Sequence, residues 1–188
     1  MTSKAPPIDS FLESVFLSEI EDQCNTAITA FSYLKDNLHT MNINLIWGLT
    51  EIILTSSANI SKFFWPGPPR TKEFGVTKQE VDDRASYLKS RLSIDDKSPL
   101  YDRDLRDHFE HYDERVQSWA KKSKNRVLLH RNIGAKGAIV TGNIDQYANM
   151  GNLDPTTFTV TFWNKSFEIP IIIQEIEKIL NATENIAR

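Results

Sequence analysis

The sequence contains one cysteine and no long apolar run, and both shortages exclude classes of protein. Cys24 has no partner for an internal disulfide, so a disulfide-stabilised secreted scaffold is excluded. The most apolar run, residues 43 to 54, is too short to span a bilayer and contains Asn44 and Glu51. Residues 1 to 7 lack the apolar stretch of a secretory signal. We therefore expect no membrane span and a reducing, cytoplasmic location.

The chain also lacks a large excess of charge of either sign. Its 22 Lys and Arg and 25 Asp and Glu residues give a formal net charge of -3, and the pI is near 5.8. This balance excludes the strongly basic character of a nucleic-acid coat protein but permits a local basic patch. A length of 188 residues suits one domain with a hydrophobic core, so we expect residues 1 to 188 to form a single domain.

Apolar side chains recur at helical spacing in the first part of the chain. They predict a long first helix over about residues 8 to 38 and a second helix that stops at Trp65-Pro66, where the proline ring prevents its continuation. The positions that carry the pattern are Phe11, Val15, Ile20, Ala27, Phe31 and Leu34 in the first helix and Leu45, Leu49, Ile53, Ile60 and Phe64 in the second.

Two further helices are predicted downstream. Thr77 and Glu80 match a capping box, which predicts a third helix that continues to about Leu92. A fourth helix is expected over about residues 100 to 122. Because the links between these helices are short, they favour a four-helix bundle over residues 8 to 131.

The last part of the chain has a different pattern. Glycines interrupt the stretch after Arg131, which we interpret as a loop with one short strand near residues 139 and 140. Alternating apolar and threonine residues from 157 to 162, followed by residues 167 to 169, predict a β-hairpin, and Pro170 suits the start of a closing helix. The predicted fold class is therefore all-α: an up-and-down bundle of about five helices with a small β-hairpin before the C-terminal helix.

Residues 105 to 115 hold two histidines, two arginines and four carboxylates. On a continuous helix, His111 would point away from the core, and Arg106 would lie roughly 140° around the axis and about 7.5 Å along it. A plain alternative is a solvated helix whose i,i+4 ion pairs contribute a few tenths of a kcal/mol. The paired histidines favour chemistry, because imidazole exchanges protons near neutral pH. The buried face would carry Leu105, Phe109, Tyr112, Val116 and Trp119.

The segment Arg106-Asp107-His108-Phe109-Glu110-His111 resembles the signature of the HEPN superfamily of small helical bundles. In that signature an arginine, usually followed by a polar residue, precedes a histidine by four to six positions. Here four residues intervene. The resemblance covers the predicted bundle. Many members are metal-independent endoribonucleases of toxin, defence or RNA-processing systems, and others are inactive binding or dimerisation modules.

The resemblance implies an RNA substrate and a catalytic pair, Arg106 and His111. His111 would transfer protons, and Arg106 would bind the scissile phosphate. It also implies a homodimer, because the clefts of active members form where two subunits pair, and it allows an antitoxin or regulatory protein as partner. No cofactor is expected. The supporting residues would be Asp107, His108, Glu110 and Asp113.

A run of cations follows the charged segment and could hold RNA phosphates electrostatically. The alternative is that these cations complement the dipole at the C-terminal end of a helix. The many carboxylates of the charged segment would repel a nucleic-acid backbone. The candidate nucleic-acid-binding residues are Lys62, Lys121, Lys122, Lys124 and Arg126, and Arg131 extends the run.

Two other interpretations stay open. His108 and His111 are three positions apart, so they could share a metal ion on a helix, although the spacing alone is weak evidence. The protein could instead be a non-catalytic helical dimerisation module of unknown function, in which Arg106 pairs with Asp113 or Glu110 across a two-fold axis.

Overall fold

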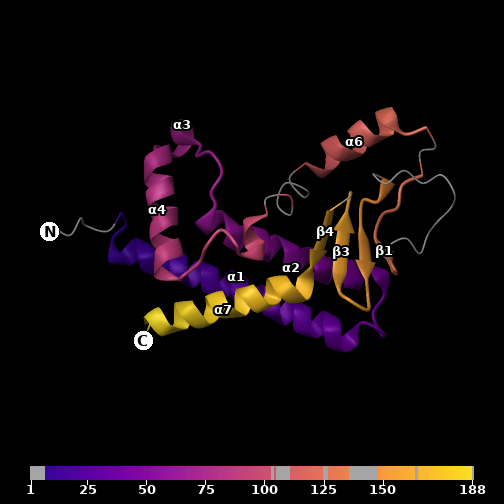
Figure 1. The fold of residues 1–188 in the computed structure, drawn as a ribbon, viewed down its shortest axis with the longest axis horizontal. Helices are drawn as coiled ribbons and strands as arrows, with labels where there is room; N and C mark the ends of the chain where they lie inside the picture. The colour runs from indigo at the N-terminus through magenta and orange to yellow at the C-terminus, as the bar shows by residue number, and fades with distance from the viewer. Residues whose placement is uncertain are drawn as a thin grey trace.

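Long helices and one small sheet make up the fold. The computed structural model describes residues 7–102, 104, 111–124, 127–135, 148–163 and 165–187. Figure 1 shows α4 towards one end of the long helices and the sheet with α6 towards the other. The elements are α1 (Ser10–Asn37), α2 (Ile43–Phe64), α3 (Thr71–Phe74), α4 (Lys78–Arg91), the 3-10 helix η1 (Pro99–Tyr101), α6 (Tyr112–Lys122), β1 (Asn132–Ile133), β2 (Asn152–Asp154), β3 (Thr159–Phe162), β4 (Lys165–Glu168) and α7 (Ile169–Ala187).

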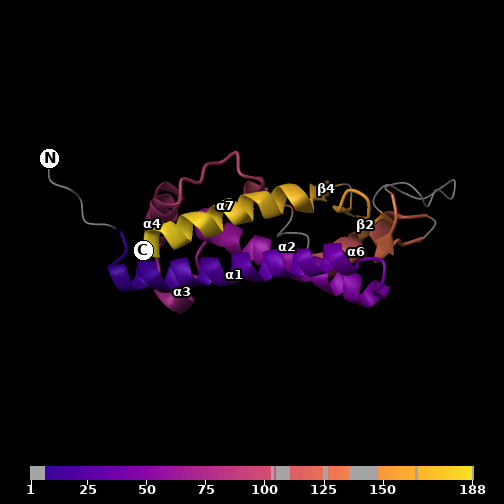
Figure 2. The same cartoon turned by 90° about the horizontal axis from the view of Figure 1, so that it is seen from below.

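The main core lies between α1, α2 and α7. The α1 helix starts after Asp9, whose carboxylate accepts a 2.8 Å hydrogen bond from the backbone N–H of Leu12. The α7 helix packs along α1 (Figure 2), so the three long helices share one apolar interior. These observations confirm the predicted first, second and closing helices. The fully buried residues include Ile20, Cys24, Ala27, Leu34, Ile53, Leu54, Ile60, Ile176 and Ile179.

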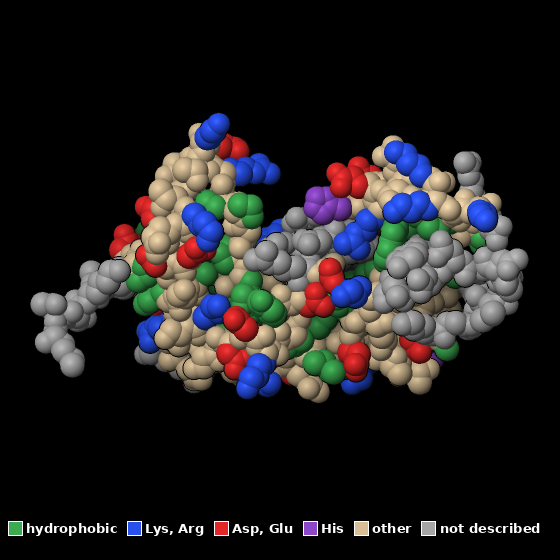
Figure 3. Space-filling view, turned by 45° about the horizontal axis from the view of Figure 1, so that its top comes forward, with side chains coloured by type: hydrophobic (Ala, Val, Ile, Leu, Met, Phe, Trp, Pro, Cys, Tyr) green, Lys and Arg blue, Asp and Glu red, His purple; other side chains and the backbone are tan. Residues whose placement is uncertain are grey.

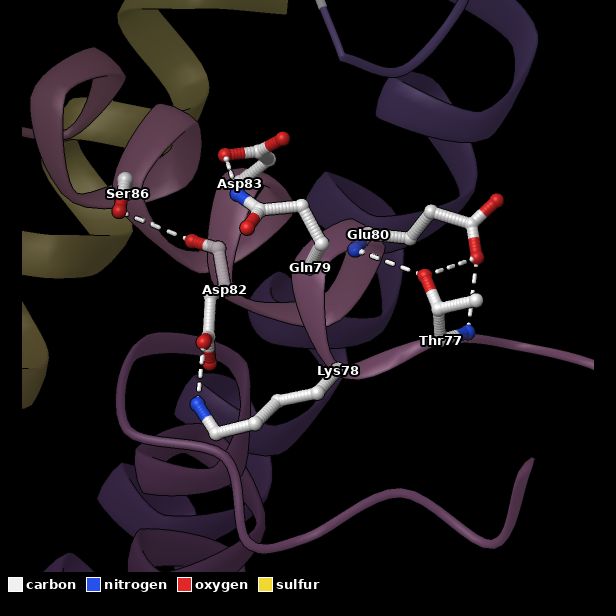
Figure 4. Close-up of polar contacts among 7 residues, drawn as sticks. All are labelled: Thr77, Lys78, Gln79, Glu80, Asp82, Asp83 and Ser86. Carbon is white, nitrogen blue, oxygen red and sulfur yellow. Dashed lines mark hydrogen bonds and ion pairs between the residues drawn. The ribbon is translucent and has the colours of Figure 1, made fainter.

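The predicted capping box is confirmed at the start of α4. The Thr77 hydroxyl accepts from the backbone N–H of Glu80 at 3.3 Å, and the Glu80 carboxylate accepts from the backbone N–H of Thr77 at 2.7 Å (Figure 4). These two bonds pair N–H groups that a helix N-terminus would otherwise leave without an acceptor. An ion pair between Lys78 and Asp82 spans the first turn of α4.

The sheet has the order β1-β2-β3-β4. The β1 and β2 strands pair in parallel, with Asn132 opposite Asn152, whereas β2, β3 and β4 pair antiparallel. The predicted hairpin is confirmed as β3 and β4, in which Val160 lies opposite Phe167. Leu153 and Val160 are fully buried, so the sheet closes one end of the helical core.

The all-α prediction is wrong, because the fold is α+β with a four-stranded mixed sheet. The prediction included the hairpin but not β1 and β2, which are two and three residues long and too short to show an alternating pattern. Their pairing joins positions 132 and 152 without a local turn, so no hairpin signal exists. The strand predicted near residues 139 and 140 lies outside the described residues.

The predicted continuous helix over residues 100 to 122 is also wrong. Asp102 has an extended conformation (φ -66°, ψ 111°), and its carboxylate accepts a 2.9 Å hydrogen bond from the backbone N–H of Asp104. This local bond competes with helical hydrogen bonding. His111 is non-helical (φ -124°, ψ 28°) and directly precedes α6. Arg106 lies outside the described residues, so the predicted 140° relationship between Arg106 and His111 stays a prediction. In the described part of the chain, no helix is long and apolar enough to cross a membrane.

Candidate functional site

An open cavity of about 330 Å³ lies where α2, the start of α6 and the sheet meet. We call it the α2–α6 cavity. Its volume is at the low end of the range for small-molecule sites, about 300–1,000 Å³. The residues that line it are Trp47, Glu51, Tyr112, His130, Arg131, Met150, Gly151 and Phe162.

Buried apolar side chains form the floor of the cavity. Trp47 and Met150 are each 1% exposed, and the rings of Trp47 and Phe162 pack with centroids 6.0 Å apart. Gly151 fits closely against this floor: a Cβ atom there would lie 3.1 Å from Cη2 of Trp47 and 3.3 Å from the backbone nitrogen of Arg131. A side chain at position 151 would therefore require these neighbours to shift by a few tenths of an ångström.

Tyr112 and His130 form a polar pair at the rim. The Tyr112 hydroxyl and Nδ1 of His130 lie 3.2 Å apart, and the two rings are tilted with centroids 5.8 Å apart. Burial raises the pKa of the Tyr112 hydroxyl, while the positive charge of Arg131 acts in the opposite direction. The phenol therefore keeps its proton at neutral pH, and the imidazole beside it is exposed.

Arg131 and Glu51 form an ion pair on the same rim. Nη2 of Arg131 lies 3.0 Å from Oε1 of Glu51, and the two side chains are 38% and 40% exposed. Among the described residues, neither Nε of Arg131 nor the indole N–H of Trp47 has a hydrogen-bond acceptor. A buried donor without an acceptor costs about 1–3 kcal/mol. A ligand that carries acceptor atoms would offset this cost if it reached these groups.

The backbone fixes the segment that carries His130 and Arg131. The N–H of Leu129 donates to the carbonyl of Ala148 at 2.8 Å, and the N–H of Asn132 donates to the carbonyl of Gly151 at 2.9 Å. Arg131 itself has a positive φ of 53°, a conformation in which only a few per cent of non-glycine residues are found. Hydrogen bonds on both sides of the pair therefore hold this turn in place.

Of the predicted catalytic and supporting residues, the structure describes His111 and Asp113. The imidazole of His111 is exposed, and its Nδ1 lies 3.4 Å from a carboxylate oxygen of Glu114, which makes an ion pair when His111 is protonated. Asp113 is exposed in the first turn of α6. The predicted residues Arg106, Asp107, His108 and Glu110 lie outside the described residues, so whether Arg106 meets His111 stays a prediction.

The predicted nucleic-acid contacts divide between two places. Lys121 and Lys122 are exposed in the last turn of α6, and Lys124 is exposed just beyond it. Figure 3 shows basic side chains gathered over this part of the surface, close to histidine and acidic groups. Lys62 is exposed in the last turn of α2, where it hydrogen-bonds to Asn59, about 16 Å along the helix from Glu51. Arg126 lies outside the described residues.

Sequence reasoning missed most of the α2–α6 cavity. It gave Glu51 only as a charge within an apolar run and Tyr112 only as part of a buried helix face. The available signals were a carboxylate within the most apolar helix and an adjacent histidine and arginine before a glycine-rich stretch. Neither signal shows that the two segments meet, because 80 positions separate Glu51 from Arg131.

In the described part of the chain, no group of three or more His, Cys, Asp or Glu side chains is placed to hold a metal ion. Comparison of the sequence with protein-family models and curated proteins, and of the fold with solved structures, finds no match. The chemistry of the residues themselves therefore carries the functional argument.

Proposed function

We propose that this protein binds RNA and cleaves it without a metal ion, and that the α2–α6 cavity holds the scissile phosphate. The observation that carries the proposal is the presence of a histidine–tyrosine pair and an arginine on one open rim, at Tyr112, His130 and Arg131. These groups supply a proton acceptor, a residue that orients it and a positive charge for a phosphoryl group. We assign the protein to the cytoplasm.

The proposed reaction uses the RNA 2′-hydroxyl as nucleophile. Its oxygen bonds to phosphorus, and the bond from phosphorus to the 5′ oxygen of the next nucleotide breaks. His130 takes the proton of the 2′-hydroxyl, and protonated His111 gives a proton to the departing 5′ oxygen. The products are a 2′,3′-cyclic phosphate and a 5′-hydroxyl end. Both histidines then return to their starting states by exchanging protons with water.

Tyr112 and Arg131 have distinct parts in this proposal. When Nδ1–H of His130 donates to the Tyr112 oxygen, Nε2 is left as the proton acceptor. Tyr112 is therefore a positioning residue. Arg131 would donate to the phosphate oxygens as negative charge develops on them. The HEPN-like Arg106 would add a second cation to the same phosphate.

Exposed lysines at the far end of α6 would hold neighbouring phosphates. Lys122 lies ten residues after Tyr112, or roughly 15 Å along the helix. Contacts of this kind contribute affinity without base specificity, and they weaken as salt rises. We therefore expect Lys121→Ala and Lys122→Ala to weaken RNA binding similarly for all sequences.

The test is cleavage of a mixed RNA pool in EDTA, with the folding of each variant checked by circular dichroism. We expect His130→Ala and Arg131→Ala to lower the rate at least tenfold. His39→Ala and Arg70→Ala are matched controls, because both residues are exposed and neither lines the cavity. His111→Ala should also slow cleavage, because His111 is the proposed proton donor, and Arg106→Ala tests the arginine of the HEPN-like motif.

Three outcomes are informative. Loss of cleavage in the His130 and Arg131 variants, with normal rates in the controls, supports the cavity as the site. Loss only in the Arg106 and His111 variants would retain RNA cleavage but contradict a catalytic role for the cavity. No metal-independent cleavage by the wild type would overturn the proposed activity.

A second candidate function is a non-catalytic module that dimerises through its helices. It is favoured by a shallow groove between α1 and α2, which is lined in part by Tyr33 and Ile52. These side chains are 52% and 44% exposed, more than a core residue would be. Sedimentation equilibrium of the wild type and of Ile52→Asp tests this candidate. A monomer at all concentrations would remove it.

A further inference from the structure

The ion pair between Glu51 and Arg131 leaves hydrogen-bonding capacity at the mouth of the α2–α6 cavity. A carboxylate has about four acceptor positions, and Arg131 takes one of them on Oε1. In the described part of the chain, Oε2 of Glu51 has no assigned donor. Because Glu51 is 40% exposed and lines the cavity, its carboxylate is accessible to a bound molecule.

A carboxylate with accessible acceptors selects among the four RNA bases by their donor patterns. Guanine presents two adjacent donors, N1–H and the N2 amino group, which match the two oxygens of one carboxylate. Adenine and cytosine each place an acceptor nitrogen beside their amino group, which the carboxylate would repel. Uracil offers one N–H between two carbonyl oxygens. Guanine is therefore the base that accommodates both carboxylate oxygens.

The cavity also has the size and aromatic character for a single base. Its volume of about 330 Å³ suits one small ligand. The rings of Tyr112 and His130 stand at the rim, where a flat base can stack on an aromatic face. Glu51 and His130 line the same cavity, so a base held by Glu51 would bring its own ribose and phosphate near the proton acceptor.

We infer that the α2–α6 cavity recognises guanine, with Glu51 accepting from N1–H and the N2 amino group and Arg131 holding Glu51 in position. This inference rests on the proposed function, because it takes RNA as the natural ligand. It adds a base preference: cleavage on the 3′ side of guanosine. Arg131 would link the carboxylate that reads the base to the phosphate that is cleaved.

The test is calorimetric titration of the wild-type protein with 3′-GMP, 3′-AMP, 3′-CMP, 3′-UMP and 3′-IMP. We expect 3′-GMP to bind about tenfold more tightly than the other three standard nucleotides, the usual discrimination of a good bidentate contact. Inosine monophosphate lacks the N2 amino group, so we expect it to bind with intermediate affinity.

Glu51→Gln should remove this preference, because the amide has one acceptor oxygen and its NH₂ group opposes N1–H. The matched control is Glu177→Gln, at an exposed position of α7 away from the cavity. The wild-type ranking needs no variant, so the inference can be tested even if Glu51→Gln folds poorly. Equal binding of all the nucleotides, or a preference unchanged in Glu51→Gln, would overturn the inference.

Mapping the cleaved positions in a mixed RNA separates this inference from the proposed function. Cleavage at all four nucleotides at equal rates would retain the ribonuclease proposal and reject guanine recognition. Selective, Glu51-dependent binding of 3′-GMP without cleavage would support the guanine site and reject the catalytic proposal.

Discussion

Gly151→Ala is a small change with a large predicted effect, because a methyl group at the floor of the α2–α6 cavity would crowd its neighbours. The new Cβ would lie 3.1 Å from Cη2 of Trp47, 3.3 Å from the backbone nitrogen of Arg131 and 3.5 Å from Cε1 of Phe162. Trp47 is 1% exposed and its ring packs against Phe162, so the shift of a few tenths of an ångström that the methyl group requires would disturb this contact.

The magnitude follows from the cost of overpacking a buried site. Adding a methyl group to such a site costs about 1–3 kcal/mol. A free-energy change of 1 kcal/mol shifts the Tm of a chain of this size by about 2–4 °C, so we expect Gly151→Ala to lower the Tm by roughly 2 to 12 °C. Because the same methyl group presses on Arg131, we also expect slower RNA cleavage.

Gly48→Ala is the matched control for this measurement. Gly48 lies inside α2, and a Cβ there has no heavy atom within 4 Å. Alanine in a helix interior is more stable than glycine by about 0.5–1 kcal/mol, so this variant should raise the Tm. Thermal unfolding followed by circular dichroism measures both variants. A Gly151→Ala protein as stable as the wild type would refute the packing described for the cavity floor.

Three further predictions concern the scaffold, and chemical denaturation measures each. Thr77→Ala removes the capping box shared with Glu80 and should cost about 0.5–2 kcal/mol; an unchanged midpoint would contradict this role. Ser61→Ala leaves the buried carbonyl of Leu100 without its 2.7 Å donor and should cost about 1–3 kcal/mol; a cost below about 0.5 kcal/mol would argue against it. Burial raises the pKa of Cys24 from 9.0 to about 12, so the folded state binds its proton more tightly than the unfolded state does. The wild type should therefore lose stability relative to Cys24→Ala as pH rises from about 9 to 12, by up to about 1.4 kcal/mol per pH unit; parallel pH profiles would refute this.

The helices could be predicted from the sequence because their signals are local. In α1 and α2 the signal is the periodic recurrence of apolar residues, and at the start of α4 it is the capping box at Thr77. Each of these signals is carried by residues that lie within a few positions of one another in the sequence. The hairpin of β3 and β4 was also predictable from alternation followed by a turn. Each of these elements depends on contacts close in sequence.

The strands β1 and β2 depend on information that is not local. The parallel pairing of Asn132 with Asn152 joins segments 20 residues apart, and two or three residues cannot display a period. The helix predicted over residues 100 to 122 is interrupted at Asp102, which is extended and whose carboxylate accepts a hydrogen bond from the backbone N–H of Asp104. Helix propensity alone does not show whether the side-chain bond of Asp102 or the helical backbone bonds will form.

The cavity was harder to predict than the fold, because its residues come from separate elements. Glu51 from α2, Tyr112 from α6 and His130 from the turn before β1 meet only in the folded chain. The ionisable groups of residues 105 to 115 are close together in the sequence, and this clustering favoured a site there. Groups that share a site in the folded chain need not be neighbours in sequence.

The most direct test of the central claim is the single-turnover rate of RNA cleavage in EDTA for the wild type, His130→Gln and His39→Gln. We expect a 2′,3′-cyclic phosphate product, a rate at least tenfold lower for His130→Gln and a wild-type rate for His39→Gln. Equal rates for all three proteins, or no cleavage by the wild type, would contradict the assignment of the α2–α6 cavity as a metal-independent ribonuclease site.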